Sequence, residues 1–126
     1  MDLLEKVVVL EQDADAFGFR WETAEQIMVQ IESECVEIRE HLHGGFEQAN
    51  QVDLQEEIGD LLHAVFSLSV FCKLNPHDTL EKTLSKFERR LNAVKQLTHE
   101  RGLSSLTGFS FDALMDVWGE AKRLVG

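Results

Sequence analysis

Apolar residues recur at helical spacing along most of this chain, and this periodicity constrains its fold more than any other feature. The clearest stretch, residues 23–42, carries them at intervals of three and four positions: Ala24, Ile27, Ile31, Cys35, Ile38 and Leu42. Residues at such intervals share one face of an α-helix. The chain has 126 residues, with one proline and eight glycines, so interruptions are few and the length suits one core. The sequence therefore predicts an all-α fold, a helical bundle of four to five helices in a single domain, 1–126.

Capping signals divide this pattern into five expected helices. Thr23 and Gln26 form a capping box before the second helix, and Asp53 is the expected cap of the third. Pro76 suits the first position of the fourth helix, and Ser110 is the expected cap of the fifth. The expected spans are about 2–16, 23–42, 53–73, 76–100 and 110–124. Because their connection is short, the second and third helices should be antiparallel neighbours.

The charge of the chain is acidic and unevenly distributed. Residues 1–72 carry 3 basic and 16 acidic side chains, a net of −13, whereas residues 73–126 carry 9 basic and 7 acidic, a net of +2. The acidic balance argues against a nucleic-acid partner, whose backbone requires a basic surface. The uneven distribution suits a metal site in the first part of the chain and phosphate-binding cations in the second.

Several features predict a cytoplasmic protein with no membrane partner. The N-terminus is acidic within two residues and lacks the pattern of a signal peptide. The longest apolar run, residues 61–72, is too short to span a bilayer and is expected to form a helix buried on most sides. Cys35 and Cys72 show no paired spacing, so we expect buried free thiols in a reducing compartment.

Two acidic steps, Glu34-x-x-Glu37 and Glu57-x-x-Asp60, carry the strongest hint of chemistry. Acid pairs at this spacing occur seven times in the chain, so spacing alone says little. On a helical wheel, however, Glu34 and Glu57 each fall about 60° from the centre of an apolar stripe, with Glu37 and Asp60 farther out. Facing carboxylates about 5 Å apart repel by about 3 kcal/mol. Such a cluster requires a proton or a cation, and a hard divalent ion such as Mg²⁺ is the usual partner of oxygen ligands.

Another metal site is conceivable but fits less well. Di-iron bundles use two Glu-x-x-His steps together with two further glutamates. Here Glu40 and His43 form one step at an expected helix end, and Asp60 and His63 form a second with aspartate in place of glutamate. His43 and His63 are better interpreted as surface or rim histidines.

The second part of the chain offers cations at helical spacing. Lys86 and Arg90 lie four positions apart, as do Trp118 and Lys122. A triphosphate needs such cations in addition to a metal, and arginine gives bidentate contacts. The alternative is that the cations pair with nearby glutamates and that Trp118 belongs to the core.

Taken together, these motifs resemble the MazG-type nucleoside triphosphate pyrophosphohydrolases of the all-α NTP pyrophosphatase superfamily. The similarity covers about residues 17–122 and rests on four motifs in order: Gly18-Phe19-Arg20-Trp21, the two acidic steps, Lys86-Phe87-Glu88-Arg89-Arg90, and Trp118-x-x-x-Lys122. Two positions depart from the pattern. Ser33 stands where the first acid of the signature is expected, and Gln30 stands where a lysine is often found.

The resemblance implies a site and a reaction. Glu34, Glu37, Glu57 and Asp60 match the Mg²⁺-binding acids, with Mn²⁺ as a substitute, and one of them would act as general base. Sequence does not say which, although Glu34 is favoured. Nucleotide contacts would come from Lys86, Arg90, Trp118 and Lys122. The reaction would cleave a nucleoside triphosphate between its α and β phosphates, for nucleotide-pool housekeeping. A homodimer or homotetramer, with the site near a subunit interface, is implied as well.

Two other functions stay open on the sequence. The chain could be a non-catalytic interaction module that keeps the fold, an interpretation that Ser33 and Gln30 support. It could also act on another phosphorylated substrate, such as phosphoribosyl-ATP or a modified nucleotide.

Overall fold

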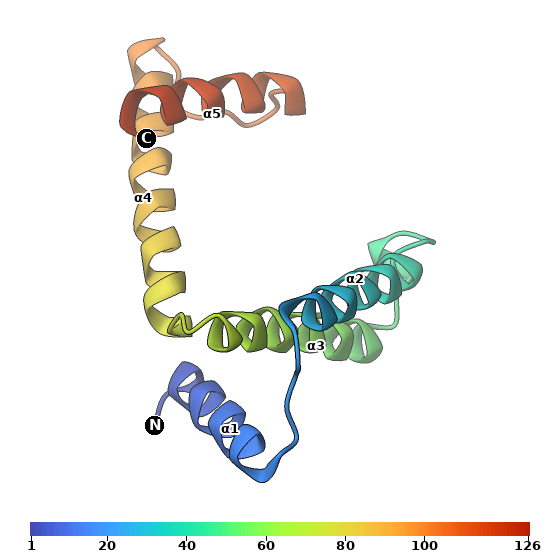
Figure 1. Cartoon of the computed structure of the whole chain (residues 1–126). Helices are drawn as coiled ribbons and strands as arrows, with labels where there is room; N and C mark the ends of the chain where they lie inside the picture. The colour runs from blue at the N-terminus through green and yellow to red at the C-terminus, as the bar shows by residue number, and fades with distance from the viewer. The chain divides into compact units, whose positions relative to one another are not determined.

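The computed structural model describes residues 1–126 and confirms the all-α class, since it contains five α-helices and no strand (Figure 1). The elements are α1 (Leu3–Phe17), α2 (Ala24–His41), the short 3-10 helix η1 (Phe46–Gln48), α3 (Gln51–Phe71), α4 (Pro76–Glu100) and α5 (Phe111–Val125). The chain divides into two compact units, Met1–Thr79 and Leu80–Gly126. That residues 1–126 form one domain stays a prediction. None of the helices combines the length and apolarity that crossing a membrane requires.

Side-chain caps fix the helix ends, largely as the sequence predicts. The capping box before α2 is confirmed. Thr23 Oγ1 accepts a hydrogen bond from the backbone N–H of Gln26, and Gln26 Oε1 accepts one from the backbone N–H of Thr23, both at 3.2 Å. The expected cap of α3 is wrong. Asn50, not Asp53, caps this helix, since Asn50 Oδ1 accepts from the amides of Val52 and Asp53 at 3.0 and 3.1 Å. Asp53 therefore lies within the first turn, where a negative charge is favourable.

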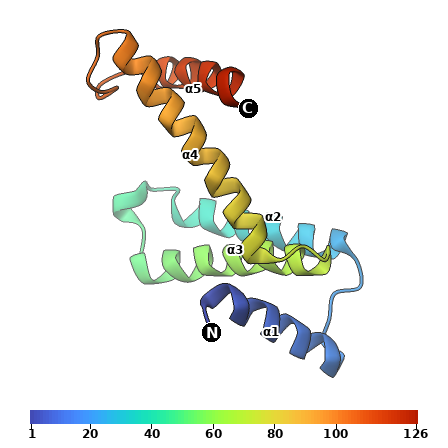
Figure 2. The same ribbon diagram turned by 90° about the vertical axis from the view of Figure 1, so that its left-hand side faces the viewer.

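The first unit is built around α2 and α3, which lie side by side and antiparallel, as predicted (Figures 1 and 2). Their contact buries Ile27 completely and leaves Leu54 and Ala64 about 6% exposed. Helix α1 also contacts α3, but none of its residues is buried. Gly18 ends α1 in the left-handed conformation, with φ of 99°, which glycine adopts without strain.

A polar contact joins α1 to α3. Glu11 Oε1 accepts a hydrogen bond from Ser67 Oγ at 2.6 Å and lies 2.8 Å from His63 Nε2. Ser67 is buried, whereas the side chain of His63 is 66% exposed, so the expectation of a surface histidine holds. This polar contact is therefore one of the interactions between α1 and α3, beside the half-buried apolar side chains of Leu4, Val7 and Val8.

Two expectations about burial are wrong. Cys35 and Cys72 are free, as expected, but both are exposed. The run 61–72 is buried only on one side, since Leu62 and Phe71 are 54% and 38% exposed. Within the first unit, only α2 and α1 contact α3, so they cover only part of its surface. The rest of its apolar face has no neighbouring helix there to pack against.

In the second unit, α5 contacts α4 through both apolar and charged groups. Ala93 of α4 and Val117 and Ala121 of α5 are buried. An ion pair joins Glu120 of α5 to Arg101, the residue that directly follows α4.

Candidate functional site

Three carboxylates from α2 and α3 converge in the first unit. Glu34, Glu37 and Glu57 each place a ligand oxygen so that all these oxygens lie within 4.8 Å of one another. Glu34 is buried, with 7% of its surface exposed, and the side chain of Glu57 is 23% exposed. Glu37 and Asp60 are exposed. The division into inner and outer acids expected from the helical wheel is therefore present in the structure.

Both buried side-chain oxygens that lack a hydrogen-bond partner belong to this cluster. They are Glu34 Oε2 and Glu57 Oε2. A buried polar atom without a partner is costly, and a carboxylate oxygen more so than a neutral group. A divalent cation among the three acids would satisfy both atoms and offset the like charges. The three acids therefore have the ligand atoms and the unpaired buried oxygens that suit a divalent metal ion.

The electrostatics of the cluster raise the pKa of Glu57 from 4.5 to about 7. The main cause is the hydrogen bond that protonated Glu57 would share with Glu37, followed by loss of solvation and by a similar bond with Glu34. When all three acids are ionised, none of them has a proton to donate. A proton shared in this way is one answer to crowded carboxylates, and a cation is the other. At neutral pH, Glu57 is thus balanced between its two protonation states.

His41 is a neighbour of the cluster that the sequence interpretation missed. Its Nε2 lies 4.0 Å from Glu57 Oε1, and its side chain is 30% exposed. The signal was present in the sequence, because His41 follows Glu37 by four positions and therefore shares its helix face.

A groove of about 1440 Å³ opens beside the cluster, within the first unit. Glu34 and Asp60 both line it, although Asp60 is not among the three acids whose oxygens converge. Trp21, which is 36% exposed, lines it as well. The remaining walls come from α1, the connector to α2, other residues of α2 and α3, and the turn after α3. The groove is large enough for a ligand of nucleotide size.

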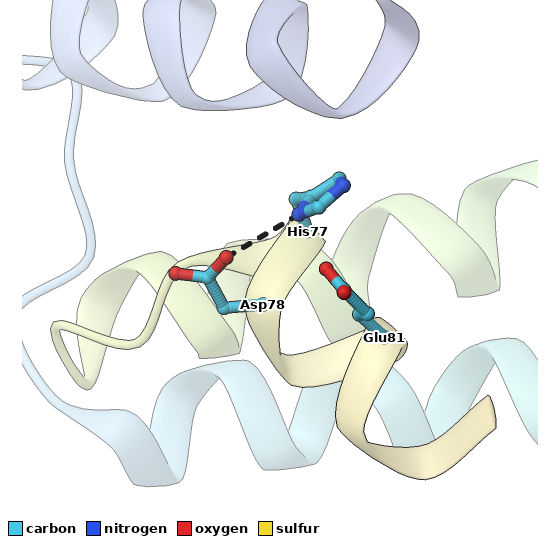
Figure 3. A group of neighbouring side chains, drawn as sticks. All are labelled: His77, Asp78 and Glu81. Atoms are coloured by element: carbon cyan, nitrogen blue, oxygen red, sulfur yellow. Dashed lines mark hydrogen bonds and ion pairs between the residues drawn. The ribbon is translucent and has the colours of Figure 1, made fainter. Parts of the chain in front are cut away.

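A second group of potential ligands lies at the start of α4. Figure 3 shows His77, Asp78 and Glu81 on its first turns, with His77 Nδ1 3.3 Å from Asp78 Oδ1. All three residues are exposed. Exposed polar groups on neighbouring turns are common without an ion, and no buried oxygen here lacks a partner. Neither of the two possible metal groups contains Glu40 or His43, so the di-iron alternative gains no support.

The four expected nucleotide-contacting residues lie on α4 and α5. Arg90 stacks over Trp118, with the guanidinium carbon 5.7 Å from the ring centroid, and Phe87 packs against the same ring at 5.8 Å. Arg90 Nε also donates to the Gly126 carbonyl at 3.0 Å. Lys86 and Lys122 are exposed. Trp118 thus packs within its unit, and whether these residues bind a nucleotide stays a prediction.

Comparison with known proteins agrees with this arrangement. A family model described as the MazG nucleotide pyrophosphohydrolase domain matches residues 22–95. A nucleoside triphosphate pyrophosphohydrolase/pyrophosphatase MazG of Thermotoga maritima is 30% identical over 113 residues, which cover 90% of this chain and 41% of that protein. A nucleoside triphosphate pyrophosphohydrolase of Escherichia coli is 31% identical over 106 residues, 84% of this chain and 39% of the relative.

The chain thus spans about two fifths of the length of these curated relatives. The matched segment contains all four acids and both residues of the first cation step, Lys86 and Arg90, and it covers more than half of the chain. The chain therefore belongs to the MazG nucleotide pyrophosphohydrolase domain family.

Proposed function

We propose that this chain hydrolyses nucleoside triphosphates between the α and β phosphates, releasing a nucleoside monophosphate and pyrophosphate. The observation that carries the proposal is the pair of buried, unpartnered oxygens of Glu34 and Glu57 in a cluster of three acids. The names of the relatives, nucleoside triphosphate pyrophosphohydrolases, support the substrate class. We further propose a cytoplasmic role in nucleotide-pool housekeeping.

Glu34, Glu37 and Glu57 are the proposed ligands of Mg²⁺, or of Mn²⁺ in its place, and Asp60 is proposed to join them from the groove wall. Such an ion, when bound, would neutralise charge on the phosphate oxygens. One of the four acids would accept the proton of the attacking water, a role that suits a carboxyl whose pKa is near the working pH. The pKa of Glu57, raised to about 7, is that of the metal-free cluster, and a bound cation would lower it, so this value does not select the base among the four acids.

The remaining residues are proposed to bind and orient the nucleotide. The phosphates would be held by Lys86, Arg90 and Lys122, because a positively charged donor forms strong, charge-assisted hydrogen bonds with a phosphate. For the base, Trp21 is supported by its place in the groove together with Glu34. Trp118 is the other aromatic candidate, and its contacts with Arg90 and Phe87 show that it also packs. Base stacking on an aromatic ring tolerates different bases, so this contact alone would not select one nucleotide.

A substrate panel tests the proposal directly. The chain is incubated with Mg²⁺ and each nucleoside triphosphate, with a modified triphosphate and with phosphoribosyl-ATP, and the products are resolved by chromatography. We expect monophosphate and pyrophosphate in equal amounts, and no turnover when the divalent cation is chelated. Release of inorganic phosphate alone would refute the cleavage position. Turnover of phosphoribosyl-ATP alone would show the substrate class to be wrong, and no turnover of any compound would favour the non-catalytic module.

A homodimer or homotetramer is also proposed, and exposed apolar residues on α3 support it. Ile58, Leu62 and Val65 are 42%, 54% and 44% exposed and share one helix face. Contiguous apolar surface of this kind is typical of protein interfaces. Light scattering on the eluting protein should return two or four times the chain mass of 14.4 kDa, and a monomer mass at micromolar concentration would contradict the proposal.

A further inference from the structure

Gln30 lies one helical turn before Glu34 on α2 and contacts its carboxylate. Gln30 Nε2 donates a hydrogen bond to Glu34 Oε1 at 2.7 Å. Gln30 is half-buried and lines the same groove as Glu34. This is the position at which the sequence departs from the lysine often found in similar proteins, so the role of the glutamine needs an explanation of its own.

The hydrogen bond gives the two oxygens of Glu34 different surroundings. Oε1 is engaged by the amide of Gln30, whereas Oε2 is buried and has no partner. Glu57 likewise has a buried, unpartnered oxygen, and with Glu37 these residues form the convergent cluster. A carboxylate held through one oxygen keeps a defined orientation, so its other oxygen is prepared for a ligand.

We propose that Gln30 is a positioning residue: it holds Glu34 through Oε1, so that Oε2 is the cation ligand, and it does so without adding charge. The inference rests on the proposed function, because it assumes a divalent cation among the three carboxylates. A neutral amide leaves the negative charge of the cluster to attract that cation, whereas a lysine ammonium would offset part of it. Glutamine at this position is therefore compatible with a working metal site and does not indicate its loss.

Gln30→Met tests the hydrogen bond, because methionine keeps the length and helix propensity of glutamine but has no amide donor. Calorimetric titration of the full chain with Mg²⁺ should give a Kd about ten- to a hundredfold above that of the wild type, the usual cost of losing an outer partner of a metal ligand. The matched control is Gln96→Met. Gln96 Nε2 donates to Glu100 Oε1 at 3.0 Å with the same spacing, on an exposed face of α4, and its loss should leave the Mg²⁺ affinity unchanged.

Gln30→Lys is the second variant, since it keeps a donor at this position and adds a positive charge. It should raise the melting temperature of the metal-free protein and lower its Mg²⁺ affinity. Wild-type Mg²⁺ affinity in Gln30→Met overturns the positioning role and leaves the proposed function intact. If Gln30→Met does not fold, as judged by circular dichroism, wild-type affinity in Gln30→Lys overturns the inference instead. A wild-type chain that binds no Mg²⁺ at millimolar concentration overturns both the inference and the proposed function.

Discussion

Replacing Glu34 by glutamine is expected to lower the rate of triphosphate hydrolysis by about a hundred- to a thousandfold, a loss as large as that caused by removing one preorganised group that stabilises a transition state. The same change should stabilise the metal-free protein. Glu34 is 7% exposed and lies among like charges, and glutamine keeps its shape while removing one charge. The gain in unfolding free energy should be about 1–3 kcal/mol, the size of a repulsion at about 5 Å with an effective dielectric of 20.

The two opposite effects distinguish a functional cluster from a structural one. Steady-state kinetics and denaturant unfolding without divalent cations measure them on the same preparation. Glu32→Gln is the matched control, because Glu32 is an exposed acid on the same helix outside the cluster, and it should change neither quantity. A Glu34→Gln variant that is fully active, or one that is markedly less stable without metal, contradicts the assignment of Glu34 as a metal ligand.

In the absence of divalent cations, the protein should become less stable as pH rises from about 4.5 to about 7. The pKa of Glu57 is raised from 4.5 to about 7, with Glu37 as the main cause. Between these values the folded chain holds a proton that the unfolded chain has released. Linkage then requires the unfolding free energy to fall with rising pH through this window, and the contribution of Glu57 is fully present only below it. Thermal melts in chelator across this pH range measure the effect.

Saturating Mg²⁺ should weaken or reverse this dependence, since the cation and the proton compete for the same carboxylates. Mg²⁺ affinity should therefore rise through the same window, and binding below pH 7 should release protons, which calorimetry in buffers of different ionisation enthalpy detects. At a Mg²⁺ concentration one hundred times its Kd, the stabilisation should be about 2.7 kcal/mol. A Glu57→Gln variant should lose the pH dependence. If the wild type shows the same pH profile with and without Mg²⁺, the competition does not exist.

The sequence was sufficient to predict the helices and the inner acids, because both depend on local periodicity. An apolar stripe with period 3.6 fixes which residues face inward, and Glu34 and Glu57 fall at its flank. The buried position of Glu34 and the antiparallel pairing of α2 with α3 follow from this pattern and from a short connection. The capping box at Thr23 is similarly local.

Features that depend on long-range contacts were not predictable in the same way. Nothing in the weak pattern of α1 indicates that Glu11 meets His63 and Ser67, which lie 52 and 56 positions away. The sequence does not identify the N-cap of α3, because both Asn50 and Asp53 are good capping residues. Which of them caps the helix depends on where the chain after η1 becomes helical. The exposed cysteines reflect how little of each helix is covered in this layer.

If Glu34, Glu37 and Glu57 together hold a divalent cation, as we propose, the ion can be located directly. Crystals grown with Mn²⁺ and a non-hydrolysable triphosphate analogue, measured with anomalous scattering, should show a peak about 2.1 Å from a carboxylate oxygen of each of the three residues. An anomalous peak only at the exposed group of His77, Asp78 and Glu81, or no peak at millimolar Mn²⁺, would show that the three carboxylates do not hold the cation.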